Sequence, residues 1–158
     1  MLRRIVFGLV VGTLSATTAF AQAAPAAPAP AAAAQAAPTA RLFASDAGMV
    51  LNFIKPDKTA DFEAVMGKLK EALQKSAKPE RKQQAATWKV FKSPDPAAGG
   101  NVLYVFMIEP AVTGADYTVS TILAEAFPAE VQALYKQYAE SYASGQNFVN
   151  LSLVTDLK

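Results

Sequence analysis

The chain has 158 residues, and its first 40 residues look like a leader and a spacer, so residues 41–158 are the part expected to fold. That length fits one domain with one hydrophobic core. The sequence has no cysteine and no histidine, which excludes disulfides, Cys/His zinc sites, His-ligated haem and His-dependent catalytic triads. We therefore expect neither a metal site nor a cofactor.

The N-terminal residues have the organisation of a secretory signal peptide. Arg3 and Arg4 precede an apolar run at residues 5–14, and Ala19-Phe20-Ala21 matches the small-x-small pattern of signal peptidase. An apolar run of ten residues is shorter than the roughly 20 residues that span a bilayer. We expect cleavage after Ala21, no membrane span in the mature protein, and a periplasmic or secreted location.

Residues 22–40 are expected to be a disordered linker, because they hold 12 alanines and 4 prolines and no large side chain that a core could bury. Of the 15 basic residues two lie in the leader, which leaves 13 basic against 13 acidic residues. This balance gives no reason to expect a nucleic-acid partner. Basic residues dominate positions 55–92 and acidic residues dominate positions 101–158. This unevenness fits either two solvated faces or self-association of complementary charges.

The folded part begins with a predicted strand at residues 48–55 and a turn at Pro56-Asp57. A helix follows, with Thr59 as its expected N-cap and its end near Lys78-Pro79. Its apolar stripe has helical spacing and consists of Phe62, Val65, Met66, Leu69 and Leu73. Strands are predicted at residues 85–92 and 102–109, the second of them apolar on both sides.

The last third of the chain predicts two helices and a closing strand. The first helix covers residues 119–127, and the second begins at Pro128 and stops at Gly145. The second helix has a stripe made of Val131, Leu134, Tyr135, Tyr138 and Tyr142. These tyrosines, with Tyr117 nearby, read as core residues whose hydroxyls reach the surface, or as a platform for a carbohydrate or a partner. Residues 148–154 predict the final strand.

The order β-α-β-β-α-β predicts an α+β, ferredoxin-like domain: a four-stranded antiparallel sheet with helices on one face and the first and third strands in the middle. Strand alternation then separates two sets of side chains. The set expected to face the helices is Met49, Leu51, Phe53, Trp88, Val90, Leu103, Val105, Met107, Val149, Leu151 and Leu153. The set expected on the other face is Val50, Asn52, Ile54, Thr87, Lys89, Phe91, Val102, Tyr104, Phe106, Ile108, Phe148, Asn150, Ser152 and Val154.

The second set is too apolar to face water, so a cover is expected over that side of the sheet. The cover could be a second copy of the sheet, a ligand, or residues 41–47. A second copy is the simplest of the three, because sheets pack face to face at a spacing of ~10 Å. We therefore expect a homodimer formed through this face.

The segments GMVLNFIKPDKTADFEAVMGKL and VLYVFMIEP, together with the helix begun by Pro128, resemble in pattern and length the dimeric α+β barrel group of ferredoxin-like domains. Its best-known members are the antibiotic-biosynthesis-monooxygenase-like proteins. The resemblance implies paired open sheets. It also implies a cavity in which such monooxygenases hold a phenolic substrate without metal or flavin. Haem-handling relatives use a histidine ligand, which this chain does not have.

Five polar side chains are the candidate pocket residues, because strand alternation places them on the face away from the helices: Asn52, Lys89, Tyr104, Asn150 and Ser152. They could converge on a cavity that takes a small apolar or aromatic ligand. They could equally pair with one another across a dimer interface, since none of them is an evident base. Two functions remain open: an exported dimeric binding or interaction module, or a cofactor-independent monooxygenase or isomerase acting on a small aromatic compound.

Overall fold

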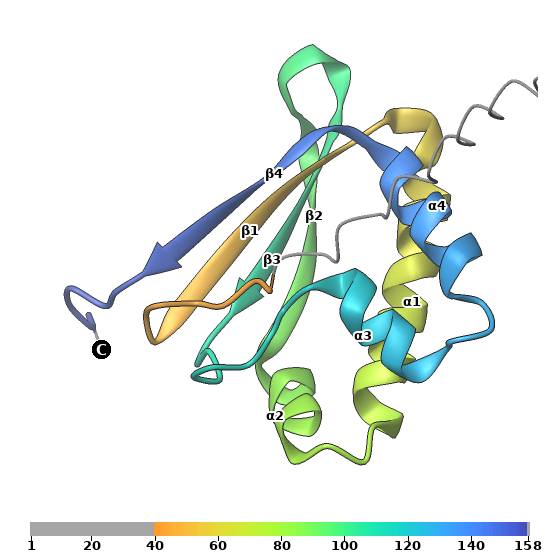
Figure 1. Cartoon of the computed structure of the whole chain (residues 1–158). Helices are drawn as coiled ribbons and strands as arrows, with labels where there is room; N and C mark the ends of the chain where they lie inside the picture. Colours follow the sequence, from red (N-terminus) through yellow and green to blue (C-terminus); the bar gives the residue numbers. More distant parts are fainter. Residues whose placement is uncertain (1–39, 158) are drawn as a thin grey trace, which may run out of the picture. The chain divides into compact units, whose positions relative to one another are not determined.

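The computed structural model describes residues 40–157, so the expected signal peptide and almost all of the expected linker lie outside the described residues. Within this range the fold is α+β: a four-stranded antiparallel sheet and four α-helices (Figure 1). The strands are β1 (Ala47–Ile54), β2 (Trp88–Pro96), β3 (Val102–Ile108) and β4 (Tyr142–Leu151). The helices are α1 (Thr59–Lys75), α2 (Pro79–Thr87), α3 (Val119–Ala126) and α4 (Val131–Ser141). None of these helices is long and apolar enough to cross a membrane.

The sheet has the strand order β2-β3-β1-β4. The central strand β1 pairs along its length with β3, from Gly48 opposite Ile108 to Ile54 opposite Val102, and with β4 on its other side. The prediction that the first and third strands lie side by side in the middle is confirmed. Figure 1 shows α1, α3 and α4 gathered on one side of this sheet.

Helix α1 agrees with its predicted stripe, because four of the five stripe residues are buried and Met66 is half-buried. Thr59 is the first helical residue and provides no side-chain cap, so the predicted N-cap is wrong. Helix α3 ends one residue before the predicted boundary. These two helices lie close to their predicted positions, because the spacing of their apolar residues fits a helix and no other regular structure.

The sequence pattern does not predict helix α2, because Lys78-Pro79 indicates only the end of the preceding helix. Proline disfavours helix in the residue before it, but its fixed φ suits the first turn of a new helix. The helix has no apolar stripe. It buries Arg81 and Gln84, which are held by hydrogen bonds. As a result β2 begins at Trp88 and not at residue 85.

The end of the chain also differs from the prediction. Helix α4 starts at Val131 and ends at Ser141, whereas the prediction ran from Pro128 to Gly145. Strand β4 then begins at once with Tyr142, which pairs with Ile54 beyond a register irregularity in β1. The helix therefore ends before Gly145, because the pairing with β1 already begins at Tyr142. This pairing places Tyr142 in the sheet instead of on the helix.

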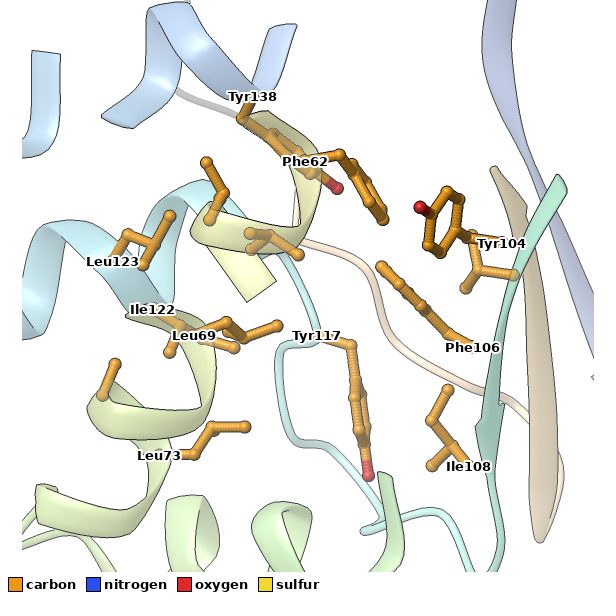
Figure 2. Close-up of a cluster of buried hydrophobic side chains, with 14 of the residues drawn as sticks. Phe62, Leu69, Leu73, Tyr104, Phe106, Ile108, Tyr117, Ile122, Leu123 and Tyr138 are labelled. Carbon is orange, nitrogen blue, oxygen red and sulfur yellow. The ribbon is translucent and has the colours of Figure 1, made fainter. Parts of the chain in front are cut away.

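The core lies between the helices and the sheet, and it contains the opposite side-chain set from the one predicted for β1, β3 and β4. Val50, Asn52 and Ile54 of β1 alternate as buried residues with half-buried neighbours, and Tyr104, Phe106 and Ile108 do the same on β3. Figure 2 shows Tyr104 and Phe106 pointing toward Phe62 of α1 and Tyr138 of α4. On β2 the assignment was right, because Trp88 lies on the helix side, opposite Ile108. Phe148, expected on the other side, packs against this core.

The other side of the sheet, here called the open face, is correspondingly apolar. Its large apolar members follow from the strand register and are Met49, Leu51, Phe53, Phe91, Leu103, Val105, Met107, Val149 and Leu151; Lys89 and Asn147 share this face. Phe91 is 52% exposed, and the other eight are half-buried. Val105 was expected in the helix-side core, so that assignment is wrong. The sheet thus has two apolar sides, and the described helices lie against one of them.

Candidate functional site

Two of the five candidate pocket residues come together under the helices. Asn52 and Tyr104 lie opposite each other on β1 and β3, and both are buried. Asn52 Nδ2 donates to the main-chain oxygens of Val50 and Tyr104, each at 3.1 Å. The Tyr104 hydroxyl donates to Glu63 at the start of α1. These contacts tie the sheet to α1 and leave neither side chain on the open face.

The other three candidate residues lie elsewhere. Lys89 is on the open face, opposite Met107. Asn150 is exposed near the end of β4, where its Oδ1 accepts a hydrogen bond from the main-chain N–H of Ala44 at 2.8 Å. Ser152 is exposed and follows the last residue of β4. The structure therefore brings together Asn52 and Tyr104 and separates them from the rest.

A cleft of about 640 Å³ opens on the helix side of the sheet, between α4, the start of α3 and the strands. Its walls are mostly aromatic and aliphatic, with a minority of hydroxyl and amide groups. The lining consists of Ala40, Arg41, Val50, Trp88, Phe106, Ile108, Tyr117, Thr118, Val119, Ser120, Tyr135, Tyr138, Ala139, Tyr142, Ser144, Gly145, Gln146 and Phe148. The volume lies in the range that small-molecule sites occupy.

Three polar lining residues of the cleft, Tyr138, Tyr142 and Gln146, form a hydrogen-bonded cluster with Asn52, which is buried behind them and does not line the cleft. Asn52 Oδ1 accepts from the Tyr142 hydroxyl at 2.9 Å and from Gln146 Nε2 at 2.7 Å. The two phenol oxygens are 2.7 Å apart, and Gln146 Nε2 lies 2.9 Å from Tyr138 and 2.8 Å from Tyr142. All four groups belong to one network, which joins α4, β4 and β1.

This cluster has two proton arrangements, because a phenol carries a single proton. If Tyr142 donates to Asn52, Tyr138 can donate to Tyr142. If Tyr142 instead donates to Tyr138, Gln146 Nε2 still donates to Asn52 Oδ1. The proton of the Tyr138 hydroxyl is then free for another acceptor. In this second arrangement the hydrogen bond from Tyr142 to Asn52 is exchanged for one from Tyr142 to Tyr138, and the cluster can offer the Tyr138 hydroxyl as a donor to a molecule in the cleft.

Burial keeps both phenols protonated. It raises the pKa of Tyr138 to about 12. Burial and the neighbouring Tyr138 raise the pKa of Tyr142 well above its usual range. At neutral pH the cluster therefore presents uncharged donors and acceptors, which suit an uncharged or acceptor-bearing group of a ligand better than a cation.

The loop at residues 116–118, which forms another wall, is fixed by an ion pair between the buried Arg81 and Glu125. Arg81 of α2 is 2% exposed and binds both carboxylate oxygens of Glu125 on α3, at 3.2 and 3.0 Å. Its Nη1 also donates to the main-chain oxygen of Asp116 at 2.6 Å, and Gln84 donates to the same oxygen. These bonds hold Asp116 in place just before Tyr117 and Thr118, which line the cleft.

Sequence reasoning missed Tyr138, Tyr142 and Gln146 as site residues. The tyrosines were interpreted as a helical ridge, and the strand was expected to begin after Gln146. A usable signal was present, since a predicted strand that carries a buried asparagine needs partners for the amide. Tyrosine and glutamine are residue types that can supply them.

Comparisons of this chain with protein-family models, with curated proteins and with solved structures gave no match. Residues 40–157 also contain no group of three or more acidic side chains that could hold a metal ion. A second groove of about 380 Å³ runs between α1 and β2, lined by Met66, Leu73, Val90 and neighbouring residues. It lacks a polar cluster of the kind found at the end of the larger cleft.

Proposed function

We propose that the protein is an exported homodimeric module that binds small apolar or aromatic molecules in the cleft beside α4. The observation that carries this proposal is the combination of aromatic walls with one cluster of polar groups at the end of the cleft. Apolar walls supply affinity, and a few fixed polar groups orient the ligand. Trp88, Phe106 and Phe148 supply the walls, and Tyr138 and Gln146 supply the polar groups.

We further propose that the domain is ferredoxin-like and that two copies form a dimeric α+β barrel. The order β2-β3-β1-β4, with β1 and β3 in the centre, supports the first part. The open face supports the second, because an apolar surface of nine side chains spread over all four strands rarely stays in contact with water. A second copy related by a two-fold axis offers a matching apolar surface of the same shape.

A cofactor-independent oxygenase or isomerase would use the same cleft, so it remains the alternative. Such chemistry needs a group that accepts a proton from the substrate. The described lining residues include no carboxylate, and the buried phenols hold their protons at neutral pH. Binding therefore demands less of these residues than proton transfer does, and it is the function we favour.

The binding proposal is tested by titrating the purified protein with the neutral probe 4-phenylbutanamide. Trp88 is the only tryptophan of the chain and lines both the cleft and the groove between α1 and β2, so its fluorescence reports binding and the variants must show where the ligand sits. We expect a saturable change that is lost in Ala139→Phe, which fills the cleft from an exposed position on α4. Ala133→Phe, exposed on the same helix and absent from the lining, is the control. Equal binding by both variants would place the ligand elsewhere.

Export is tested separately. Intact-mass analysis of the protein recovered from the periplasm or medium should give a chain that begins at Gln22. A mature protein that retains Met1 would contradict the expected signal peptide. This result would leave the binding proposal unaffected, because the cleft is built from residues 40–148.

A further inference from the structure

The cleft has one charged residue among its described lining residues, and that residue is a cation, Arg41. Its backbone is firmly held: the Arg41 N–H donates to Asp116 Oδ1 at 2.9 Å and to Thr118 Oγ1 at 3.1 Å. Its carbonyl oxygen accepts from the N–H of Tyr117 at 2.9 Å. Three hydrogen bonds therefore fix the point from which the arginine side chain extends.

The hydrogen bonds that Arg41 donates within the described range come from its main-chain N–H, and its guanidinium makes no hydrogen bond or ion pair with another described residue. Its charge nevertheless reaches the polar cluster. Burial raises the pKa of both Tyr138 and Tyr142, and the positive charge of Arg41 acts in the opposite direction on each. An unpaired cation and the hydroxyl and amide donors of the cluster therefore act on the same region of the cleft.

This arrangement sets the charge of the preferred ligand. The guanidinium and the Tyr138 hydroxyl can donate hydrogen bonds to a ligand, and no described lining residue carries a negative charge. A planar carboxylate matches the guanidinium fork, accepts from nearby donors and is favoured by the positive charge. The positive charge of Arg41 would repel a ligand amine.

We propose that the cleft selects amphipathic carboxylates, with an apolar or aromatic body on Trp88, Phe106 and Phe148 and a carboxylate paired with Arg41. This inference rests on the proposed binding function and names its ligand class. Arg41 is then the residue that determines specificity, whereas the aromatic walls determine the affinity common to charged and neutral ligands.

The test compares 4-phenylbutanoate with 4-phenylbutanamide, which have nearly the same shape and differ in charge. Both are titrated into the purified full-length protein and followed by Trp88 fluorescence. We expect the carboxylate to bind about fivefold more tightly, the size of one ion pair at a solvent-accessible site. This preference should decrease as sodium chloride is added.

The variants Arg41→Gln and Arg41→Lys separate the charge from the fold. Arg41 is exposed and its structural bonds are made by its backbone, so both variants should fold. Arg41→Gln should lose the preference and keep the affinity for the amide, whereas Arg41→Lys should keep part of the preference. Equal binding of the two probes by the wild type would overturn the selectivity and leave the binding function standing. Failure of both probes to bind would overturn both.

Discussion

Asn52 and Tyr104 face each other across β1 and β3, and the Asn52 side chain donates to the main-chain oxygen of Tyr104 at 3.1 Å. Asn52 is completely buried, and its Oδ1 accepts two further hydrogen bonds from Tyr142 and Gln146. One amide therefore fixes the central strand pair and one end of the cleft. A buried polar residue that does not line the cleft thus positions two residues that do.

Replacing Asn52 with leucine, which has a similar volume, should lower the free energy of unfolding by about 2–3 kcal/mol. The reason is that buried hydrogen-bonding groups on Gln146 and on the strands lose their partner. The measurement is urea unfolding at a fixed protein concentration. Gln132→Leu is the control, because Gln132 is exposed on α4 and should change stability by less than about 1 kcal/mol. Equal losses for the two variants would mean that the cluster does not stabilise the core.

The two faces of the sheet show where sequence reasoning reached its limit. Alternation along a strand separates side chains into two sets but does not say which set faces the helices. Asn52 and Tyr104 made their set look solvent-facing, although both are buried and hydrogen-bonded. The uniformly apolar set of Leu51 and Val105 instead lies on the open face. Because both sets are largely apolar, the partners of the polar residues decide the orientation, and strand alternation alone does not identify those partners.

The helices also show that a sequence pattern predicts only what local apolar spacing determines. Apolar spacing predicted α1 and α3 well, since burial of one stripe is what stabilises them. Helix α2 has no stripe and is held by Arg81 through Glu125 and Asp116, which are 44 and 35 positions away. The cleft was missed for a related reason. Tyr138 and Gln146 meet only because β4 starts directly after α4.

Substitution of Leu69 tests which face of α1 is buried, a point on which the sequence prediction and the structure agree. Leu69 is 3% exposed on α1, and Leu69→Ala should cost about 2–5 kcal/mol through lost burial and the cavity left behind. Its neighbour Lys70 is exposed, so Lys70→Ala should stay within about 0.5 kcal/mol of the wild type. Chemical denaturation measures both. A loss below about 1 kcal/mol for Leu69→Ala would contradict its place in the core.

Glu125 should make stability depend on pH. The hydrogen bonds from Arg81 hold the pKa of Glu125 below its ordinary value of 4.5. A carboxyl with a lowered folded-state pKa stabilises the fold above its unfolded pKa, and this contribution is lost as the pH falls through the folded value. Between about pH 5 and pH 3 the wild type should therefore lose stability more steeply than Glu125→Gln.

The control for this prediction is Glu80→Gln, since Glu80 is exposed on α2. Its pH profile should follow that of the wild type in urea unfolding at each pH. Parallel profiles for the wild type and Glu125→Gln would show that the ion pair does not carry the acid sensitivity.

The open face should mediate the proposed homodimer. The structure shows which residue of the central strand β3 lies on that face and can test the interface. Phe106 is buried under the helices, so a charge there would disrupt the core itself. Val105 lies on the open face, where Val105→Lys would place an unpaired charge in the interface. Sedimentation at micromolar concentration should give a wild-type dimer and a monomeric variant with unchanged helical circular dichroism. Ala64→Lys, exposed on α1, should remain dimeric. A wild-type monomer would rule out the homodimer.

The most direct test of the central claim is a nuclear magnetic resonance titration of the ¹⁵N-labelled protein with 4-phenylbutanamide. We predict concentration-dependent shifts of the Gln146 side-chain amide and of the Tyr138 and Val119 main-chain amides, all of which belong to residues that line the cleft and not the groove. Shifts confined to Met66, Gln74 and Val90, which line the groove between α1 and β2, or no saturable shifts at all, would contradict binding in the cleft.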